Sequence, residues 1–133
     1  MTTYLLDTSI IICYLQGKEN AVKLLNSIEG ELTSSCICLA ELFEGVYRVK
    51  NKSETEKIVT DFFKSLSELY PVDEKIAKYF GKIRAKLKIE GHVIEDIDIF
   101  IAATCLAYDL TLITNNTKHF SSLTSLKIYT SLK

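Results

Sequence analysis

The sequence predicts an α/β protein: a three-layer α/β/α sandwich around a mainly parallel sheet. Short apolar runs with strand character alternate along the chain with helical patterns, as expected for such a sheet. The 133 residues match a single domain, 1–133. A hydrophobic fraction of 47% can fill its core without disulfides or a structural metal.

The strands are recognised as short apolar or β-branched runs that end in polar residues. In chain order they are expected at residues 3–6, 31–36, 111–113 and 127–129, with a short extended segment at 69–72 around the only proline. Because helices separate these strands, the strands are expected to run parallel and the helices to cover both faces of the sheet.

Apolar residues at helical spacing, with start and stop signals, define six helices. They are expected at residues 8–16, 19–29, 38–50, from 53 onward, 74–89 and 96–108. Gly17, Gly30 and Gly91 are the expected stops of the first, second and fifth helices. Ser53 and Glu56 form a capping box that opens the fourth. The last helix is apolar almost all round, so we expect it to be central.

Charge and hydropathy narrow the classes of function. With 16 basic and 17 acidic residues the net charge is −1, so nucleic acid would have to be bound through a local basic face. Lys75, Lys78, Lys82 and Lys86 form a stripe on one helix; the last three are candidate RNA contacts, and a solvated helix face is the alternative. The chain lacks a signal peptide and any apolar run of ~18 residues, so we expect a cytoplasmic protein that does not contact the membrane.

The cysteines and histidines fit no metal or redox pattern. The cysteines (Cys13, Cys36, Cys38 and Cys105) lack zinc-site spacing and a C-x-x-C pair, and they lie among apolar residues. We expect them to be small core residues, and pairing would depend on the redox compartment. His92 and His119 are expected to be ordinary loop residues.

Acidic residues occupy the same kind of position three times. Asp7 follows the first strand, Glu41 lies one turn into the helix after the second, and Asp96 and Asp98 open the central helix. Because strand C-termini and the helix N-termini after them line one edge of a parallel sheet, the three positions are expected to converge. Structural alternatives are a helix N-cap for Asp7 or Asp96 and a solvated first-turn residue for Glu41. Asp98 fits no such role easily, because a carboxylate in an apolar helix is unfavourable without a cation.

Clustered carboxylates repel one another, and a hard divalent cation with oxygen ligands relieves this repulsion. Mg²⁺ or Mn²⁺ at such a site leaves positions for water and phosphate oxygens, and it lowers the pKa of a bound water. The acidic residues therefore indicate phosphodiester hydrolysis.

Four segments in order make the chain resemble a known family. They are Tyr4–Ser9, Leu39–Gly45, Asp96–Ala103 and Leu112–Phe120. Over nearly its whole length the chain resembles the PIN-domain ribonucleases, specifically the VapC-type toxins of toxin–antitoxin pairs. The resemblance implies a PIN-like fold, metal-dependent endonucleolytic cleavage of RNA, a cognate antitoxin that blocks the site, and a homodimer. It also implies that the exposed side of the helices over residues 38–66 carries a partner contact, with Tyr47 and either Phe62 or Phe63 as anchors.

The resemblance further implies which residues form the site. Asp7, Glu41 and Asp98 would be catalytic and would hold one or two Mg²⁺ or Mn²⁺ ions, with Asp96 as an accessory ligand. The other accessory residues would be Thr8, Ser9, Thr114, Asn115 and Asn116. Asn116 stands where many family members carry a fourth aspartate, which leaves a second metal site open.

Two alternatives remain. A catalytically weak or inactive PIN-like domain would bind RNA or a partner without cutting; the three acids oppose this reading and Asn116 favours it. A phosphatase or phosphotransferase with Asp7 as nucleophile would need a second acid shortly after Asp7 in the sequence and a dedicated lysine. The residues that follow Asp7 are instead Thr8 and Ser9.

Overall fold

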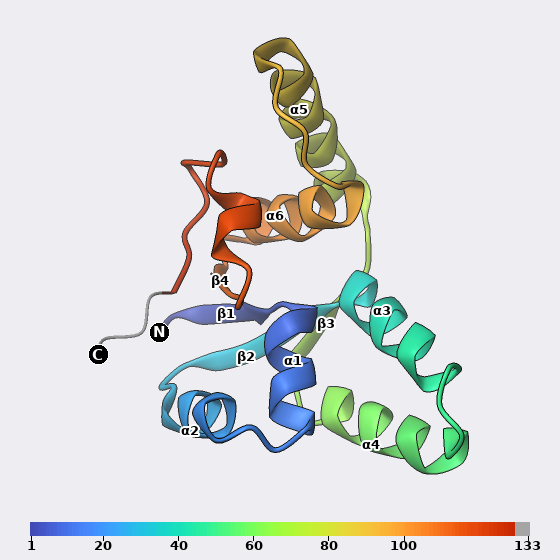
Figure 1. The fold of residues 1–133 in the computed structure, drawn as a ribbon. Helices are drawn as coiled ribbons and strands as arrows, with labels where there is room; N and C mark the ends of the chain where they lie inside the picture. Colours follow the sequence, from blue (N-terminus) through green and yellow to red (C-terminus); the bar gives the residue numbers. More distant parts are fainter. Residues whose placement is uncertain (130–133) are drawn as a thin grey trace.

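Four short parallel strands form the centre of the fold, in the order β3-β2-β1-β4 (Figure 1). The computed structural model describes residues 1–129. The strands are β1 (Thr3–Leu6), β2 (Glu31–Ser35), β3 (Glu68–Tyr70) and β4 (Thr111–Ile113). The α-helices are α1 (Thr8–Leu15), α2 (Glu19–Ser27), α3 (Cys36–Val46), α4 (Lys52–Lys64), α5 (Glu74–Glu90) and α6 (Asp96–Tyr108), and a short 3₁₀-helix, η1, spans Thr117–Phe120. The predicted α/β class with a parallel sheet is confirmed.

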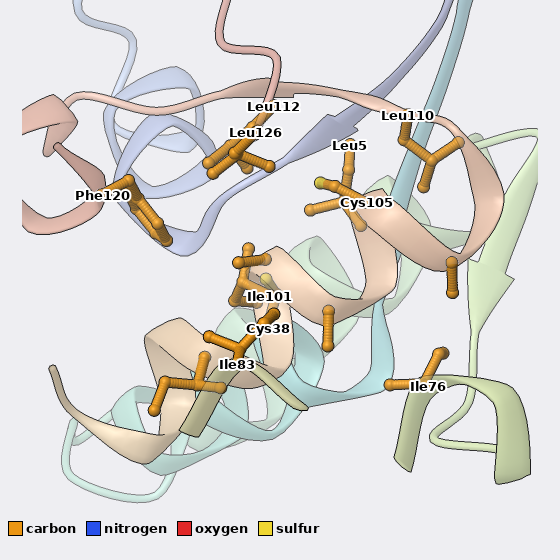
Figure 2. Packing of buried hydrophobic residues seen from close by; sticks show 14 of the residues in the cluster. Leu5, Cys38, Ile76, Ile83, Ile101, Cys105, Leu110, Leu112, Phe120 and Leu126 are labelled. Carbon is orange, nitrogen blue, oxygen red and sulfur yellow. The ribbon is translucent and has the colours of Figure 1, made fainter. Parts of the chain in front are cut away.

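The alternation of side chains along β1 and β4 creates two separate cores. Leu5 and Leu112 face one side of the sheet and pack in a cluster with residues of α5 and α6. Figure 2 shows buried residues of this cluster at close range. Leu6 and Ile113 face the other side and pack with α1 to α4. Successive residues of a strand point to opposite faces of a sheet. The pairs Leu5–Leu6 and Leu112–Ile113 therefore each place one side chain in either core. Figure 1 shows both layers.

Helix α6 lies at the centre of the first core, as its composition predicts. Ile99, Ile101 and Ala102 are buried, and so is Thr104, whose hydroxyl donates to the carbonyl of Phe100 at 2.8 Å. Helix α5 packs along α6 and ends at Gly91, which has the expected left-handed φ of 78°. The first turn of α6 is therefore carried on the most enclosed helix of the fold.

Several element boundaries differ from prediction. Helix α3 begins two residues earlier, because Ser35 at the end of β2 accepts a hydrogen bond from the N–H of Ile37 at 3.0 Å and caps the helix directly. It also ends at Val46, so Val49 is 40% exposed. The capping-box prediction is wrong: α4 starts at Lys52 after Asn51, and Ser53 lies inside the helix.

The second predicted helix also ends early, and Gly30 has a different role from the one predicted. Helix α2 stops at Ser27, and Ile28 is already extended. Gly30 has a φ of 150°, and a Cβ there would lie 2.4 Å from the carbonyl oxygen of Thr2. Gly30 thus permits a close approach of two backbones beside the first residues of β1.

The predicted last strand, 127–129, is reduced to one parallel bridge between Leu112 and Ile128. In the described part of the chain all four cysteines are free; Cys38 and Cys105 are buried as predicted, whereas Cys13 and Cys36 are half-buried. Burial raises the pKa of the Cys38 thiol to about 12. Within residues 1–129, the helices are too short or too polar to cross a membrane.

Candidate active site

Asp7 lies directly after β1 at the carboxyl edge of the sheet. Its backbone N–H continues the pairing with β4 by donating to the carbonyl of Ile113 at 2.9 Å. The residue is only 5% exposed. One carboxylate oxygen, Oδ1, accepts from the backbone N–H of Thr8 at 2.8 Å, which confirms the helix-cap alternative. The cap uses only Oδ1, so it does not exclude a second role for this carboxylate.

The loop after β4 holds that second oxygen. Thr114 Oγ1 donates to Asp7 Oδ2 at 2.7 Å and accepts from the backbone N–H of Asn116 at 2.9 Å. Ser9 Oγ lies 3.4 Å from the same Asp7 oxygen and accepts from the backbone N–H of Asn115 at 3.0 Å. Residues 114–116 are therefore connected to Asp7 through two hydroxyl groups, across more than 100 positions of sequence.

Glu41 reaches the same place from the second turn of α3. Thr8 Oγ1 donates to Glu41 Oε1 at 2.5 Å. Burial raises the pKa of the Glu41 carboxyl; the hydrogen bond from Thr8 opposes this, and the negative charges of Asp7 and Asp98 add to it. These charge effects show that Glu41 lies within electrostatic range of both aspartates.

Asp98 lies in the first turn of α6, with 15% of its side chain exposed. Burial raises the pKa of its carboxyl, His119 lowers it, and the charge of Asp7 raises it further. His119 Nδ1 lies 3.2 Å from Asp98 Oδ2. The prediction that His119 is an ordinary loop residue is thus wrong: η1 anchors it beside the site, because the next residue, Phe120, is buried in the core.

Asp7, Glu41 and Asp98 lie within electrostatic range of one another, whereas Asp96 faces away toward α5. Asp96 is half exposed, and its Oδ1 lies 3.6 Å from the Arg84 guanidinium on α5. The N-cap of α6 is Glu95, so the alternative that made Asp96 the cap is wrong. The lysine stripe lies exposed on α5, where Lys78 pairs with Glu74 and Lys86 with Glu90.

The donor atoms of the acidic residues suit a hard cation, although the side chains do not enclose one in this arrangement. Within residues 1–129, no three His, Cys, Asp or Glu side chains lie close enough together to ligate a single ion. Each carboxylate instead faces a neutral or weakly basic partner: Asp7 faces Thr114, Glu41 faces Thr8 and Asp98 faces His119. None of the three has a Lys or Arg ion-pair partner in that part of the chain. Oxygen donors without a fixed counter-cation are what Mg²⁺ and Mn²⁺ require.

Comparison with known proteins places this site in a family. A family model described as PIN domain matches residues 4–125. The chain belongs to the PIN domain family. Its curated relatives include Ribonuclease VapC1 of Methanocaldococcus jannaschii, 35% identical over 127 residues, which are 94% of this chain and 85% of that protein. Ribonuclease VapC2 of Rickettsia felis is 32% identical over 128 residues, covering 92% and 93%.

Solved PIN-domain structures share the whole fold. VapBC2 from Rickettsia felis, bound to a DNA fragment from its promoter, matches with a TM-score of 0.88 and 28% identity over 96% of this chain and 98% of that one. FitAcB from Neisseria gonorrhoeae matches with a TM-score of 0.81 and 28% identity over 96% of each chain. The expected family resemblance is confirmed.

In this PIN domain the residues predicted to be accessory form hydrogen bonds at the site mainly through hydroxyl and backbone groups. Thr8, Ser9 and Thr114 contribute hydroxyls to the acidic cluster. Asn115 and Asn116 contribute backbone N–H groups, and the Asn115 side-chain amide lies 3.3 Å from Cys13 Sγ. Sequence reasoning named these residues but could not assign the atoms, and it treated His119 as an ordinary loop residue.

Proposed function

We propose that this protein is a metal-dependent endoribonuclease and the toxin of a type II toxin–antitoxin pair. The observation that carries the proposal is the buried carboxylate of Asp7, which lies within electrostatic range of Glu41 and Asp98 at the carboxyl edge of a parallel sheet. Relatives over 30% identical along nearly the whole chain are named ribonucleases, which supports RNA as the substrate.

Asp7, Glu41 and Asp98 are the proposed ligands of Mg²⁺ or Mn²⁺, and Asp96 is an accessory acid at the rim, paired with Arg84. When bound, the ion would activate a water molecule and stabilise negative charge on the phosphate and the leaving oxygen. Binding requires that Glu41 and Asp98 exchange their present partners, Thr8 and His119, for the ion. Burial raises the pKa of both carboxyls, and the partners Thr8 and His119 only partly oppose this, so a cation that compensates both charges would be stabilised here.

The surrounding residues orient the acids. Thr114 and the N–H of Thr8 hold both oxygens of Asp7, so this carboxylate keeps one orientation. His119 holds Asp98 at the start of α6, and its 52% exposed ring leaves one side free to meet a phosphate. Hydrogen bonds of this kind set ligand orientation in metal sites, and their loss commonly lowers metal affinity or activity about 10–100-fold.

Asn116 supports a site with one dominant ion. Its backbone N–H is used by Thr114, and its side chain is neutral where a fourth carboxylate would add charge. An amide oxygen can still accept a hydrogen bond from a metal-bound water, but it contributes little to a second ion's affinity.

An antitoxin and a second copy of the chain are the proposed protein partners, in a cytoplasmic setting. The solved neighbours include VapBC complexes, which supports the antitoxin. Exposed apolar side chains in α1, just after α3 and in α4 (Ile12, Tyr47 and Ile58) are candidate partner contacts. Tyr47 keeps its proposed anchor role at 60% exposure, whereas Phe63 is buried and Phe62 packs on Tyr14. The lysines at 78, 82 and 86 remain proposed RNA contacts, although two of them are paired with glutamates.

The test is cleavage of a labelled RNA by purified, antitoxin-free protein in Mg²⁺, in Mn²⁺ and in chelator. We expect cleavage that requires metal and is lost in Asp7→Asn, Asp98→Asn and Glu41→Gln. Glu44→Gln is the matched control, because Glu44 lies one turn along the same helix and is exposed beside Arg48. A folded protein that binds RNA but never cuts it would support the alternative of an RNA-binding module. Asn116→Asp would then be tested as the change that restores cleavage. Hydrolysis of a chromogenic phosphate ester would favour a phosphatase.

A further inference from the structure

His119 lies beside the acidic site and carries a kind of donor atom that the proposed ligands lack. Asp7, Glu41 and Asp98 supply only carboxylate oxygens, whereas the imidazole of His119 supplies nitrogen. The distance between His119 Nδ1 and Asp98 Oδ2 is 3.2 Å. Two neighbouring ligands of an octahedral ion, each about 2.1 Å from the metal, lie about 3 Å apart. The spacing of these two atoms therefore suits neighbouring ligands of one ion as well as a hydrogen bond.

A series of hydrogen bonds ties the backbone of His119 to the buried acid of the site. The N–H of His119 donates to the carbonyl of Asn116 at 3.0 Å, and the N–H of Asn116 donates to Thr114 Oγ1 at 2.9 Å. Thr114 in turn donates to Asp7 Oδ2 at 2.7 Å. The imidazole is thus held near Asp98 by a segment that is itself anchored on Asp7, and metal ligands need this kind of support.

The other candidates for a fourth ligand are weaker than His119. Asn116 offers only an exposed amide, and Asp96 faces Arg84 at 3.6 Å. Three carboxylates already outweigh the charge of one divalent ion, so a neutral fourth ligand adds a bond without adding repulsion. A neutral imidazole meets this requirement. With 52% of the His119 side chain exposed, the second ring nitrogen can keep its proton and donate to water.

The kind of donor atom decides which ion such a site prefers. Carboxylate and water oxygens suit Mg²⁺, whereas imidazole nitrogen suits transition-metal ions of the first row. Mg²⁺ gains little from a nitrogen ligand, because it is small and gives up its water molecules reluctantly. Three carboxylates and one imidazole should therefore bind Co²⁺ or Mn²⁺ more tightly than Mg²⁺.

We propose that His119 is a direct ligand of the metal ion, and that it makes the site selective for transition-metal ions over Mg²⁺. The inference rests on the proposed function, because it concerns the same metal site. When the ion binds, the contact between His119 and Asp98 is replaced by a contact of each side chain with the ion. Asn116 then leaves no gap in the ligand set, since His119 supplies the fourth donor.

The test measures metal binding rather than cleavage. Affinities for Co²⁺ and for Mg²⁺ are measured by titration calorimetry on protein without an affinity tag. His119→Asn removes the imidazole and keeps an amide that can hydrogen-bond to Asp98. His92→Asn is the matched control, because the other histidine of the chain lies 3.9 Å from Glu90 at the C-terminal end of α5. Thermal melts in chelator establish that each variant is folded.

We expect His119→Asn to lower the affinity for Co²⁺ at least about tenfold and the affinity for Mg²⁺ less than about threefold. His119→Asp, which replaces nitrogen with a carboxylate oxygen, should raise the affinity for Mg²⁺ and reduce the preference for Co²⁺. Pulsed EPR of bound Mn²⁺ should detect coupling to an imidazole nitrogen in the unmodified protein and in His92→Asn. The same coupling should be absent in His119→Asn.

Equal losses of Co²⁺ and Mg²⁺ affinity in His119→Asn would overturn the inference, because His119 would then only orient Asp98 through a hydrogen bond. Unchanged affinities for both ions, or no nitrogen coupling in the unmodified protein, would overturn it as well. In each of these cases, metal-dependent RNA cleavage by the unmodified protein leaves the proposed function standing. A folded, unmodified protein that binds none of the three ions and cuts no RNA would refute both proposals.

Discussion

Thr114→Val tests whether the loop after β4 fixes the key carboxylate. Valine has nearly the shape of threonine, so the change removes the hydroxyl and leaves the packing. Three hydrogen bonds disappear: one to Asp7 Oδ2 at 2.7 Å, one from the N–H of Asn116 at 2.9 Å and one with Ser9 Oγ at 3.3 Å. Asn116 is exposed, so water can replace its bond, whereas Asp7 is only 5% exposed and cannot be resolvated without rearrangement.

The expected loss of stability therefore comes mainly from the Asp7 bond, since Ser9 Oγ keeps its contacts with Asp7 Oδ2 and the N–H of Asn115. A hydrogen bond to a charged group contributes about 1.5–3 kcal/mol. Unfolding 133 residues has an entropy of about 0.28 kcal/mol per kelvin, so the Tm of the metal-free protein should fall by roughly 5–11 °C. Because Asp7 would no longer be held, RNA cleavage should fall about 10–100-fold.

Thr114→Ser is the control, because it keeps the hydroxyl and loses one methyl group, about 0.8 kcal/mol. Thermal melts in chelator and cleavage rates in Mn²⁺ provide the two readouts. In the Asp7→Asn background, Thr114→Val should lose much of its effect on stability, since the charged acceptor is absent. A valine variant that melts within about 2 °C of the unmodified protein and cuts RNA at the same rate would refute the argument that Thr114 orients Asp7.

Three further predictions follow from the site and the sheet. Burial raises the pKa of Glu41 and of Asp98, so the folded state keeps their protons to higher pH than the unfolded state. Their contribution to stability is present at low pH and is lost as the pH rises above about 4. Asp98→Asn should therefore become more stable relative to the unmodified metal-free protein between about pH 4 and 7. A stability difference that stays constant with pH in urea titrations would contradict this. His119→Ala should lower RNA cleavage about tenfold because Asp98 loses its partner, whereas His92→Ala, at the far end of α5 beside Glu90, should not; equal rates for the two variants would remove His119 from the site. Gly30→Ala should destabilise the fold by about 1–3 kcal/mol, because its Cβ would meet the Thr2 carbonyl. Gly81→Ala, in open space on α5, should stabilise it by about 0.5–1 kcal/mol, and similar denaturation midpoints for both would show that Gly30 is not constrained.

The layered fold could be predicted because its signals are local. Alternation in β1 and β4 sets which residues face each core, and the continuous apolar character of α6 sets its central place. Boundaries were less accurate where a tertiary contact overrides local propensity. Ser35 caps α3 at the end of β2, and Gly30 is required by the backbone at Thr2; neither contact can be seen in the residues nearby in sequence.

The candidate site was predicted as a set of acids but not as a network. The acids stand out in sequence because three carboxylates interrupt apolar segments at equivalent positions. Their partners do not stand out, because hydroxyl residues and histidines are common in loops. Thr114 meets Asp7 only after β4 pairs with β1, and His119 meets Asp98 only because Phe120 is buried.

The parallel pairing of β1 with β4 joins the start of the chain to a segment near its end. Tyr4 pairs with Thr111 and Leu6 with Ile113. During synthesis, Asp7 is made almost at once, but Thr114 and His119 follow more than a hundred residues later. Contacts between such distant residues form late, since the loop between them must close first. A nascent chain on the ribosome thus has its acids without their orienting partners. The complete network around Asp7 and Asp98 can therefore form only when translation of the chain is nearly finished.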